Sequence, residues 1–254
     1  MSCRAVASVC IIVIAAGLSC GQAERPERTT EAVPPQDTIF VGLPGGLFVT
    51  SLGDSVLIEP FEMSRFEVTN RLYAGLASQA GLELPPDPQF GDIPDYIYEF
   101  GEYPVVSVSP DEALSAAAVI GCRLPTLPEW EYAASYGLTI SSARGLDVYP
   151  WGVLDPVDAQ NPANHLYGDT WEDRAADGYP WTAPVGSYPL TDLGLADIAG
   201  NVAEMAMIPD DTIGFAVCGG AYASPSEELL ISRHGYLERN DRARHIGFRL
   251  VRSR

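Results

Sequence analysis

Two carboxylates in the stretch GLADIAGNVAEM, residues 194–205, stand out as candidates for chemistry. Asp197 and Glu204 flank a Gly-Asn turn, and the residues between and around them are small or apolar. A carboxylate in such surroundings is costly to bury unless something neutralises its charge. The sequence therefore raises the question of what compensates these two acids.

The long segment that leads to Glu204 is rich in oxygen atoms able to bind hard cations. Carboxylates, amide oxygens and backbone carbonyls are calcium ligands. The spacing is not that of an EF-hand, and Asx-turns that satisfy loop backbone would explain the same composition. Composition alone favours these turns over a metal site. The side chains concerned are Asn161, Asn164, Asp169, Asp173, Asp177, Asp192 and Asp197.

Other kinds of site find little support. His165, His234 and His245 are scattered, without the paired Cys or Glu spacing of a zinc site. No Gly-rich phosphate loop follows a strand, and the two Gly-Gly pairs are typical of tight turns. The net charge of −19 speaks against nucleic acid, whose phosphates need a basic surface.

The N-terminus predicts export. An apolar run, Ala5–Leu18, has the length of a secretory signal and ends at Ser19-Cys20, which resembles a bacterial lipobox. We expect residues 1–20 to be a signal with lipidation at Cys20, and residues 21–38 to be a flexible tether. The protein would then be a membrane-anchored lipoprotein that faces the periplasm or the cell surface. The alternative is ordinary signal cleavage near Ser19 or Ala23.

The rest, residues 39–254, has elements that suit an α+β domain with long loops. Strands are expected over 39–68, 214–222 and 245–252, and loops over 138–200. Helices should begin after Thr69, Ser109 and Thr126, and the last two of these residues open capping boxes.

Two cysteines, Cys122 and Cys218, remain in the folded part. Either they form a disulfide or they are two separately buried thiols.

Several stretches in order resemble the formylglycine-generating enzyme family, the sulfatase-modifying factors. The similarity extends over residues 39–252 and implies that family's fold, an elaborated C-type-lectin-like domain braced by calcium. The stretches are FEMSRFEVTNRLYA, YPVVSVSPDEA, RLPTLPEWEYAA, YPWG, APVGSYP, GLADIAGNVAEM, CGGAY and IGFRLVR.

The resemblance implies an answer to the opening question, because members of the family hold two calcium ions in the loop region. Matched residue by residue, one site would use the side chains of Asn164 and Asp177 with the carbonyls of His165 and Tyr179. The second site would use Asp197, Glu204 and the carbonyls of Gly200 and Val202. Each carboxylate would then meet a divalent cation, and the ions would hold irregular chain in place.

The resemblance also argues against the family's oxidase activity. Its enzymes convert a sulfatase cysteine to formylglycine with copper held by two cysteines, because soft thiolates suit Cu(I). Here Ser224 and Leu229 stand at those two positions, and Ala221 and Ala203 replace a Ser and a Trp that line the pocket. We therefore expect no copper.

Three functions remain open. The first is a calcium-stabilised module that binds a protein or a glycan, with its variable face between Ala221 and His245. The second is a formylglycine-generating-type or other protein-modifying enzyme of altered chemistry in the cell envelope. The third is a structural part of an envelope complex. On the variable face, the side chains that suit recognition are Tyr222, His234, Tyr236, Arg239, Asn240 and Arg242, although a solvated loop explains them equally well.

Overall fold

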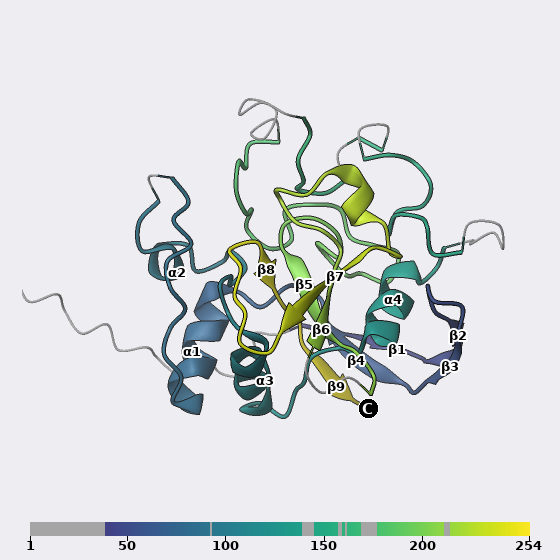
Figure 1. Cartoon of the computed structure of the whole chain (residues 1–254), viewed down its shortest axis with the longest axis horizontal. Coiled ribbons are helices and arrows are strands. Elements are labelled where there is room, and N and C mark those ends of the chain that lie inside the picture. The colour runs from purple at the N-terminus through teal and green to yellow at the C-terminus, as the bar shows by residue number, and fades with distance from the viewer. Residues whose placement is uncertain are drawn as a thin grey trace, which may run out of the picture.

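The computed structural model (Figure 1) describes residues 39–91, 93–138, 145–156, 159–160, 162–168, 177–210 and 214–254. The expected signal, the lipidation site Cys20 and the tether lie outside these residues, as do Asn161, Asp169 and Asp173. Within the described part, no helix is long and apolar enough to cross a membrane.

Two small antiparallel sheets form the lower part of the molecule in Figure 1. One has the order β1-β4-β9 and brings the two ends of the domain together. The other is a hairpin of β2 and β3. These strands span Phe40–Leu43 (β1), Gly46–Val49 (β2), Ser55–Ile58 (β3), Phe61–Ser64 (β4) and Val251–Ser253 (β9).

A four-stranded sheet of order β7-β6-β5-β8 lies at the centre. β5 pairs antiparallel with β6 and parallel with β8, so that Glu204 lies between Cys218 and Gly247. The strands span Ala203–Met207 (β5), Gly214–Cys218 (β6), His234–Glu238 (β7) and Ile246–Gly247 (β8).

The helices begin where the capping signals predict. Thr69 caps α1, and Ser109 and Thr126 form complete capping boxes at α3 and α4. In the α4 box, the Thr126 hydroxyl accepts from Glu129 N–H while the Glu129 carboxylate accepts from Thr126 N–H at 2.8 Å. The helices span Asn70–Ala80 (α1), Tyr96–Glu99 (α2), Pro110–Ala118 (α3) and Leu127–Ser135 (α4), and a 3-10 turn, η2, spans Ser226–Leu229.

Three elements were not expected from the sequence. α2 lies in a stretch to which the sequence analysis assigns no element, and β5 follows directly after the predicted metal-binding turn. β7 lies inside the segment that the sequence analysis treats as a variable face. The α+β class and the long loops are confirmed, since no helix or strand is assigned between 136 and 202 in the described residues.

The core also settles the pairing of the cysteines. Cys122 and Cys218 are both free thiols, so the disulfide alternative is wrong. The two side chains belong to different apolar clusters, one around α1 and α3 and one around α4.

The capping box of α4 gives a direct test of this local structure. Thr126→Ala should lower the free energy of unfolding by about 1 kcal/mol, because Glu129 N–H loses the hydroxyl that accepts its hydrogen bond. Thr126→Ser keeps the hydroxyl and is the matched control. Urea unfolding measures both, and equal stability of the Ala variant and the wild type would contradict the assigned cap.

Candidate functional site

Glu204 forms a buried ion pair with Arg249. Both side chains are fully buried. The guanidinium binds the carboxylate through two bonds, with Arg249 Nε donating to Oε2 at 2.6 Å and Nη2 donating to Oε1. Trp130 Nε1 also donates to Oε2, at 2.8 Å. A two-bond Arg–carboxylate pair is geometrically specific. Glu204 therefore has a protein cation as its partner, which the sequence analysis did not foresee.

Arg249 also connects the ion pair to the surrounding backbone. Its guanidinium donates to the carbonyls of Ser64 at 3.1 Å and Ala196 at 2.9 Å. Ser64 ends β4, and Ala196 precedes the turn that carries Asp197. One side chain thus joins an outer sheet, the central strand β5 and the loop region.

Two further carboxylates share this interior. Glu67 accepts from the side chain of Asn201 at 2.6 Å and from Val202 N–H at 3.1 Å. Asp197 Oδ2 accepts from Gly186 N–H at 2.5 Å. Glu67, Asp197 and Glu204 are all at most 5% exposed, and Arg249 is the one cation among the charges that act on Glu67. The cluster therefore carries a surplus of negative charge when its acids are ionised.

The pKa values show the cost of this surplus. Burial raises the pKa of Glu67 well above its usual range, and the charges of Asp197 and Glu204 raise it further. Burial raises the pKa of Asp197 to about 6, although the hydrogen bond from Gly186 opposes the rise. Without a further cation, the cluster favours protonated acids.

The first predicted metal group lies next to this cluster. Asn164 and His165 are buried. The Asn164 carbonyl accepts from Asn201 N–H at 2.8 Å, and this bond joins the two predicted groups. Asp177 accepts from Tyr179 N–H at 2.9 Å and from the Tyr188 hydroxyl at 2.5 Å.

Within the part of the chain that the structure describes, one buried oxygen in each predicted group has no hydrogen-bond partner. They are Asn164 Oδ1 and Asp197 Oδ1. Buried polar atoms are nearly always satisfied, and an orphan often marks an ion or water that belongs there. Both are hard oxygen ligands, which suits calcium. Among the described residues no three His, Cys, Asp or Glu side chains converge on one point, so an ion would depend on carbonyls as well.

The turn that carries Asp197 has an unusual backbone. Asp197 and Asn201 have φ values of 50° and 58°, and Gly200 has a φ of 80°. A Cβ at Gly200 would lie 2.5 Å from the Asn164 carbonyl oxygen. Glycine is therefore required here both for its conformation and for the close approach of two backbone segments. Strained positions of this kind cluster at functional sites.

The positions that match the family's copper ligands, Ser224 and Leu229, lie outside the acidic cluster, in and before the 3-10 turn η2. Leu229 is fully buried and packs with Tyr149, Ala163 and Ala199. Ser224 lines a cavity of about 340 Å³, together with Glu228, Arg233 and His245. Among the described residues, no hydrogen bond or ion pair engages the Arg233 guanidinium or the Glu228 carboxylate.

The variable face differs from the sequence-based expectation. Tyr222 is 1% exposed and packs against Phe90 and Trp181, so it lies beneath the surface instead of on it. Arg239 and Arg242 form ion pairs with Asp111 and Glu112 at the start of α3. His234 faces the buried Glu131, with Nε2 and Oε1 3.2 Å apart. Tyr236 and Asn240 are exposed. Arg233, which lines the cavity near Ser224, was not identified from the sequence, because no motif or spacing around it points to a site.

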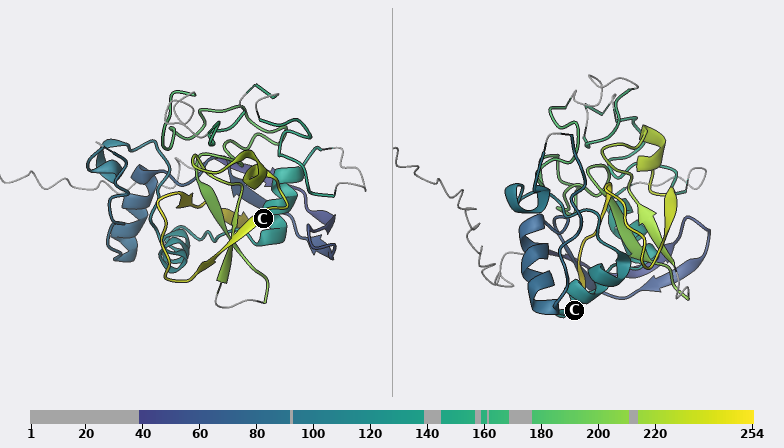
Figure 2. Two further views of the ribbon diagram at one scale, coloured as in Figure 1. Left: turned by 45° about the horizontal axis from the view of Figure 1, so that its top comes forward. Right: turned by 60° about the vertical axis from the view of Figure 1, so that its left-hand side comes forward.

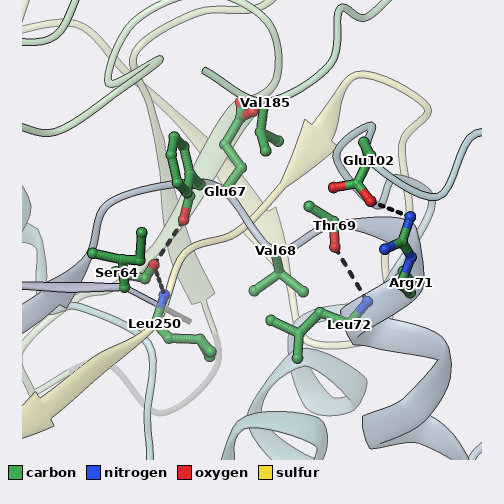
Figure 3. A pocket seen from close by; sticks show the side chains of 11 residues that line it. Ser64, Glu67, Val68, Thr69, Arg71, Leu72, Glu102, Val185 and Leu250 are labelled. Carbon is green, nitrogen blue, oxygen red and sulfur yellow. Dashed lines mark hydrogen bonds and ion pairs between the residues drawn. The ribbon is translucent and has the colours of Figure 1, made fainter. Parts of the chain in front are cut away.

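A larger cavity of about 550 Å³ lies on another side, between the start of the domain and α1 (Figure 3). Its rim carries the ion pair of Arg71 and Glu102. The Glu67 carboxylate is held by Asn201 and Val202. The charged groups of this cavity are therefore already paired within the chain.

Comparison with known proteins identifies the family. The model of the sulfatase-modifying factor enzyme 1-like domain matches residues 23–254. The chain belongs to the sulfatase-modifying factor family. A formylglycine-generating enzyme of Thermomonospora curvata is 28% identical over 221 residues, which cover 65% of this chain and 69% of that enzyme.

Other sulfatase-modifying factor relatives match over a shorter stretch. The formylglycine-generating enzyme of Mycobacterium tuberculosis is 39% identical over 108 residues, 40% of this chain and 32% of that enzyme. An inactive C-alpha-formylglycine-generating enzyme 2 of Bos taurus is 40% identical over 104 residues, 41% of this chain and 32% of that protein. The match thus spans about a third of the length of these two relatives.

Solved structures show the same fold. CarF has a TM-score of 0.63 at 23% identity, with 85% of this chain and 98% of that chain covered. Treponema denticola variable protein 1 has a TM-score of 0.62 at 17% identity, with 85% and 95% covered. At these identities the likeness concerns the fold alone. The fold inferred from the resemblance is confirmed.

Removing Arg249 should strongly destabilise the domain. Arg249→Met leaves three buried carboxylates without their cation, and we expect a loss of about 3–5 kcal/mol in the free energy of unfolding. Arg252→Met, which breaks the exposed pair with Glu62, should cost less than about 1 kcal/mol. Urea unfolding compares the two. Equal losses would show that the Arg249 pair does not organise the core.

The raised pKa values predict how pH affects the metal-free protein. A carboxyl group whose folded pKa is raised contributes its full stability below its unfolded pKa and loses it as pH rises through the folded value. For Asp197, this window runs from 3.8 to about 6. In the presence of chelator, the free energy of unfolding of the wild type should fall by about 3 kcal/mol as pH rises through this window. That of Asp197→Asn should not show this fall, because the amide does not ionise. Urea unfolding at several pH values measures the difference, and parallel curves would contradict the prediction.

Proposed function

We propose that this sulfatase-modifying factor domain is an exported, lipid-anchored binding module for a protein or a glycan, stabilised by two calcium ions, and that it lacks the family's copper oxidase activity. The observation that carries the proposal is the cavity at Ser224. It keeps a polar lining but has no thiolate.

Under this proposal, the described thiols would not replace the missing copper ligands. Cys218 lies on β6, fully buried, and burial raises the pKa of its thiol well above the usual range, with the charges of Glu204 and Glu131 adding to the rise. Burial also raises the pKa of Cys122. Both thiols therefore stay protonated at neutral pH, whereas Cu(I) binds thiolates. That a relative bears the name of an inactive formylglycine-generating enzyme agrees with loss of catalysis within the family.

The lining of the cavity suits recognition. Its lining includes the small or apolar residues Ala203, Val217 and Gly235 and the polar residues Ser224, Glu228 and Arg233. Ligand sites typically combine an apolar surface with a few convergent polar groups. Tyr236 on β7 also lines the cavity and is 57% exposed. A polar group of a protein or glycan ligand would meet Arg233 and Glu228 without displacing an ion pair formed among the described residues.

Calcium would serve the same module by holding its loops. Asn164 and Asp177 would bind one ion with the carbonyls of His165 and Tyr179. Asp197 would bind the other with the carbonyls of Gly200 and Val202, and Glu204 would be shared with Arg249. The support is the pair of unsatisfied oxygens and the surplus of buried negative charge. A divalent ion would bind the unsatisfied oxygens and would neutralise part of the buried negative charge.

A copper titration tests the loss of oxidase activity. The wild type should not compete for Cu(I) with a soluble chelator, and it should leave a cysteine-containing peptide unoxidised. The variant Ser224→Cys/Leu229→Cys restores two thiols at the matching positions and should bind Cu(I). Copper-dependent oxidation by the wild type would overturn the proposal and favour the enzymatic alternative.

Thermal melting tests the calcium sites. At a calcium concentration about 100 times the dissociation constant of both sites, the melting temperature should rise by roughly 10–20 °C relative to protein in chelator, because each ion adds about 2.7 kcal/mol. Asp177→Ala and Asp197→Ala should each reduce the rise. Asp192→Ala, an exposed acid in the same region, should not. A wild-type melting temperature that ignores both calcium and chelator would contradict the two sites.

A further inference from the structure

A group of exposed aliphatic side chains lies on the β2–β3 hairpin, residues 45–58. Leu47, Val49, Leu52 and Leu57 are 76%, 56%, 80% and 69% exposed. Leu47 pairs directly with Leu57 across the two strands. Val49 lies two residues from Leu47 and therefore points to the same face, while Leu52 lies in the connecting turn. We call these four side chains the leucine face.

The opposite face of the hairpin already has its partner. Phe48 and Val56 pack against the core cluster around α4, and the Phe48 ring contacts Tyr132 edge-on with centroids 5.6 Å apart. The Tyr132 hydroxyl donates to the Gly45 carbonyl at 2.9 Å. The hairpin is thus fixed to the domain by one side and presents apolar groups on the other. Its leucine face is not needed to hold it in place.

The hairpin also lies at the margin of the molecule. β2 and β3 pair only with each other in the described part of the chain. In Figure 1 and in both views of Figure 2, the hairpin lies at the right-hand margin of the molecule. Asp54 is the only charged residue between 45 and 58, in a chain of net charge −19. Contiguous apolar groups on such a projection mark a contact with another protein or with a membrane.

The composition and size of the leucine face favour the membrane. Protein–protein hot spots are enriched in Trp, Tyr and Arg, whereas Leu and Val are under-represented there. A stable protein interface also buries about 800 Å² on each partner, more than four partly exposed aliphatic side chains provide. A bilayer surface needs neither shape complementarity nor a minimum area. It takes up apolar side chains to a shallow depth.

The proposed anchor brings this surface within reach. Eighteen residues, 21–38, separate Cys20 from the domain, a tether of at most about 60 Å when extended. Anchoring turns a weak contact into an intramolecular one, with an effective concentration set by the tether. A few apolar side chains that would not hold a free protein on a bilayer can then hold an anchored one.

We infer that the leucine face inserts into the surface of the bilayer that carries the chain, so that the domain has a second membrane contact besides its lipid. This inference rests on the proposed lipid anchor at Cys20. The contact would fix the orientation of the domain, with α4 and the hairpin toward the membrane. The leucine face would contact the apolar layer beneath the lipid head groups and would not distinguish one head group from another.

Hydrogen exchange on vesicles tests the inference. The chain from Cys20 onward is coupled through this thiol to maleimide lipid in phosphatidylcholine vesicles that contain phosphatidylglycerol. The coupling is selective because Cys122 and Cys218 are buried. Amide exchange over residues 45–58 should be at least about tenfold slower on vesicles than in solution. The variant Leu47→Ser/Leu57→Ser should lose this protection.

The matched control is Val153→Ser/Leu154→Ser, which removes two other exposed apolar side chains, 61% and 54% exposed, and should keep the protection. Equal exchange with and without vesicles would overturn the inference. Protection that appears without lipid as the protein concentration rises would assign the face to a second copy and would also overturn it. The anchor is tested separately by whether Cys20→Ala releases the protein from membranes, so the two failures are distinguishable.

Discussion

The structure depends on how one buried cation is shared among three buried carboxylates. Arg249 binds Glu204 directly and lies close enough to Glu67 and Asp197 to affect the pKa of both. The same guanidinium holds the carbonyls of Ser64 and Ala196. The outer sheet, the central sheet and the loop region therefore meet at one side chain. A buried pair of this kind adds little net stability over an apolar core, but breaking it is costly. It specifies how three parts of the chain fit together.

The surplus of negative charge links this core to the proposed calcium sites. Either protonated acids or a further cation must neutralise it, because ionised carboxylates in an apolar interior are unfavourable. Unsatisfied oxygens on Asn164 and Asp197 mark where a cation would be held. Loops fixed in this way would make a rigid support for the cavity at Ser224. The hairpin lies on a separate part of the molecule, so membrane contact and ligand binding would not compete.

Local features of the fold could be predicted from the sequence, and long-range partners could not. Thr69, Ser109 and Thr126 predict helix starts because a cap needs only a hydroxyl and a following turn. β5 was missed because a Gly-Asn turn precedes it and because its Ala, Glu and Met residues favour a helix over a strand. Glu204 was identified as a charge that needs a partner, but Arg249 lies 45 residues away, and one sequence contains no information on that pairing. For the same reason the burial of Tyr222 and the ion pairs of Arg239 and Arg242 came only from the structure.

The metal content of the purified protein tests the central claim most directly. Protein prepared without chelator, exchanged into metal-free buffer and analysed by inductively coupled plasma mass spectrometry should carry about two calcium ions per chain. Asp197→Asn should carry about one, and copper should be absent. A fully folded wild type that contains no divalent metal would contradict the account. The surplus charge of Glu67, Asp197 and Glu204 would then be neutralised by protons alone.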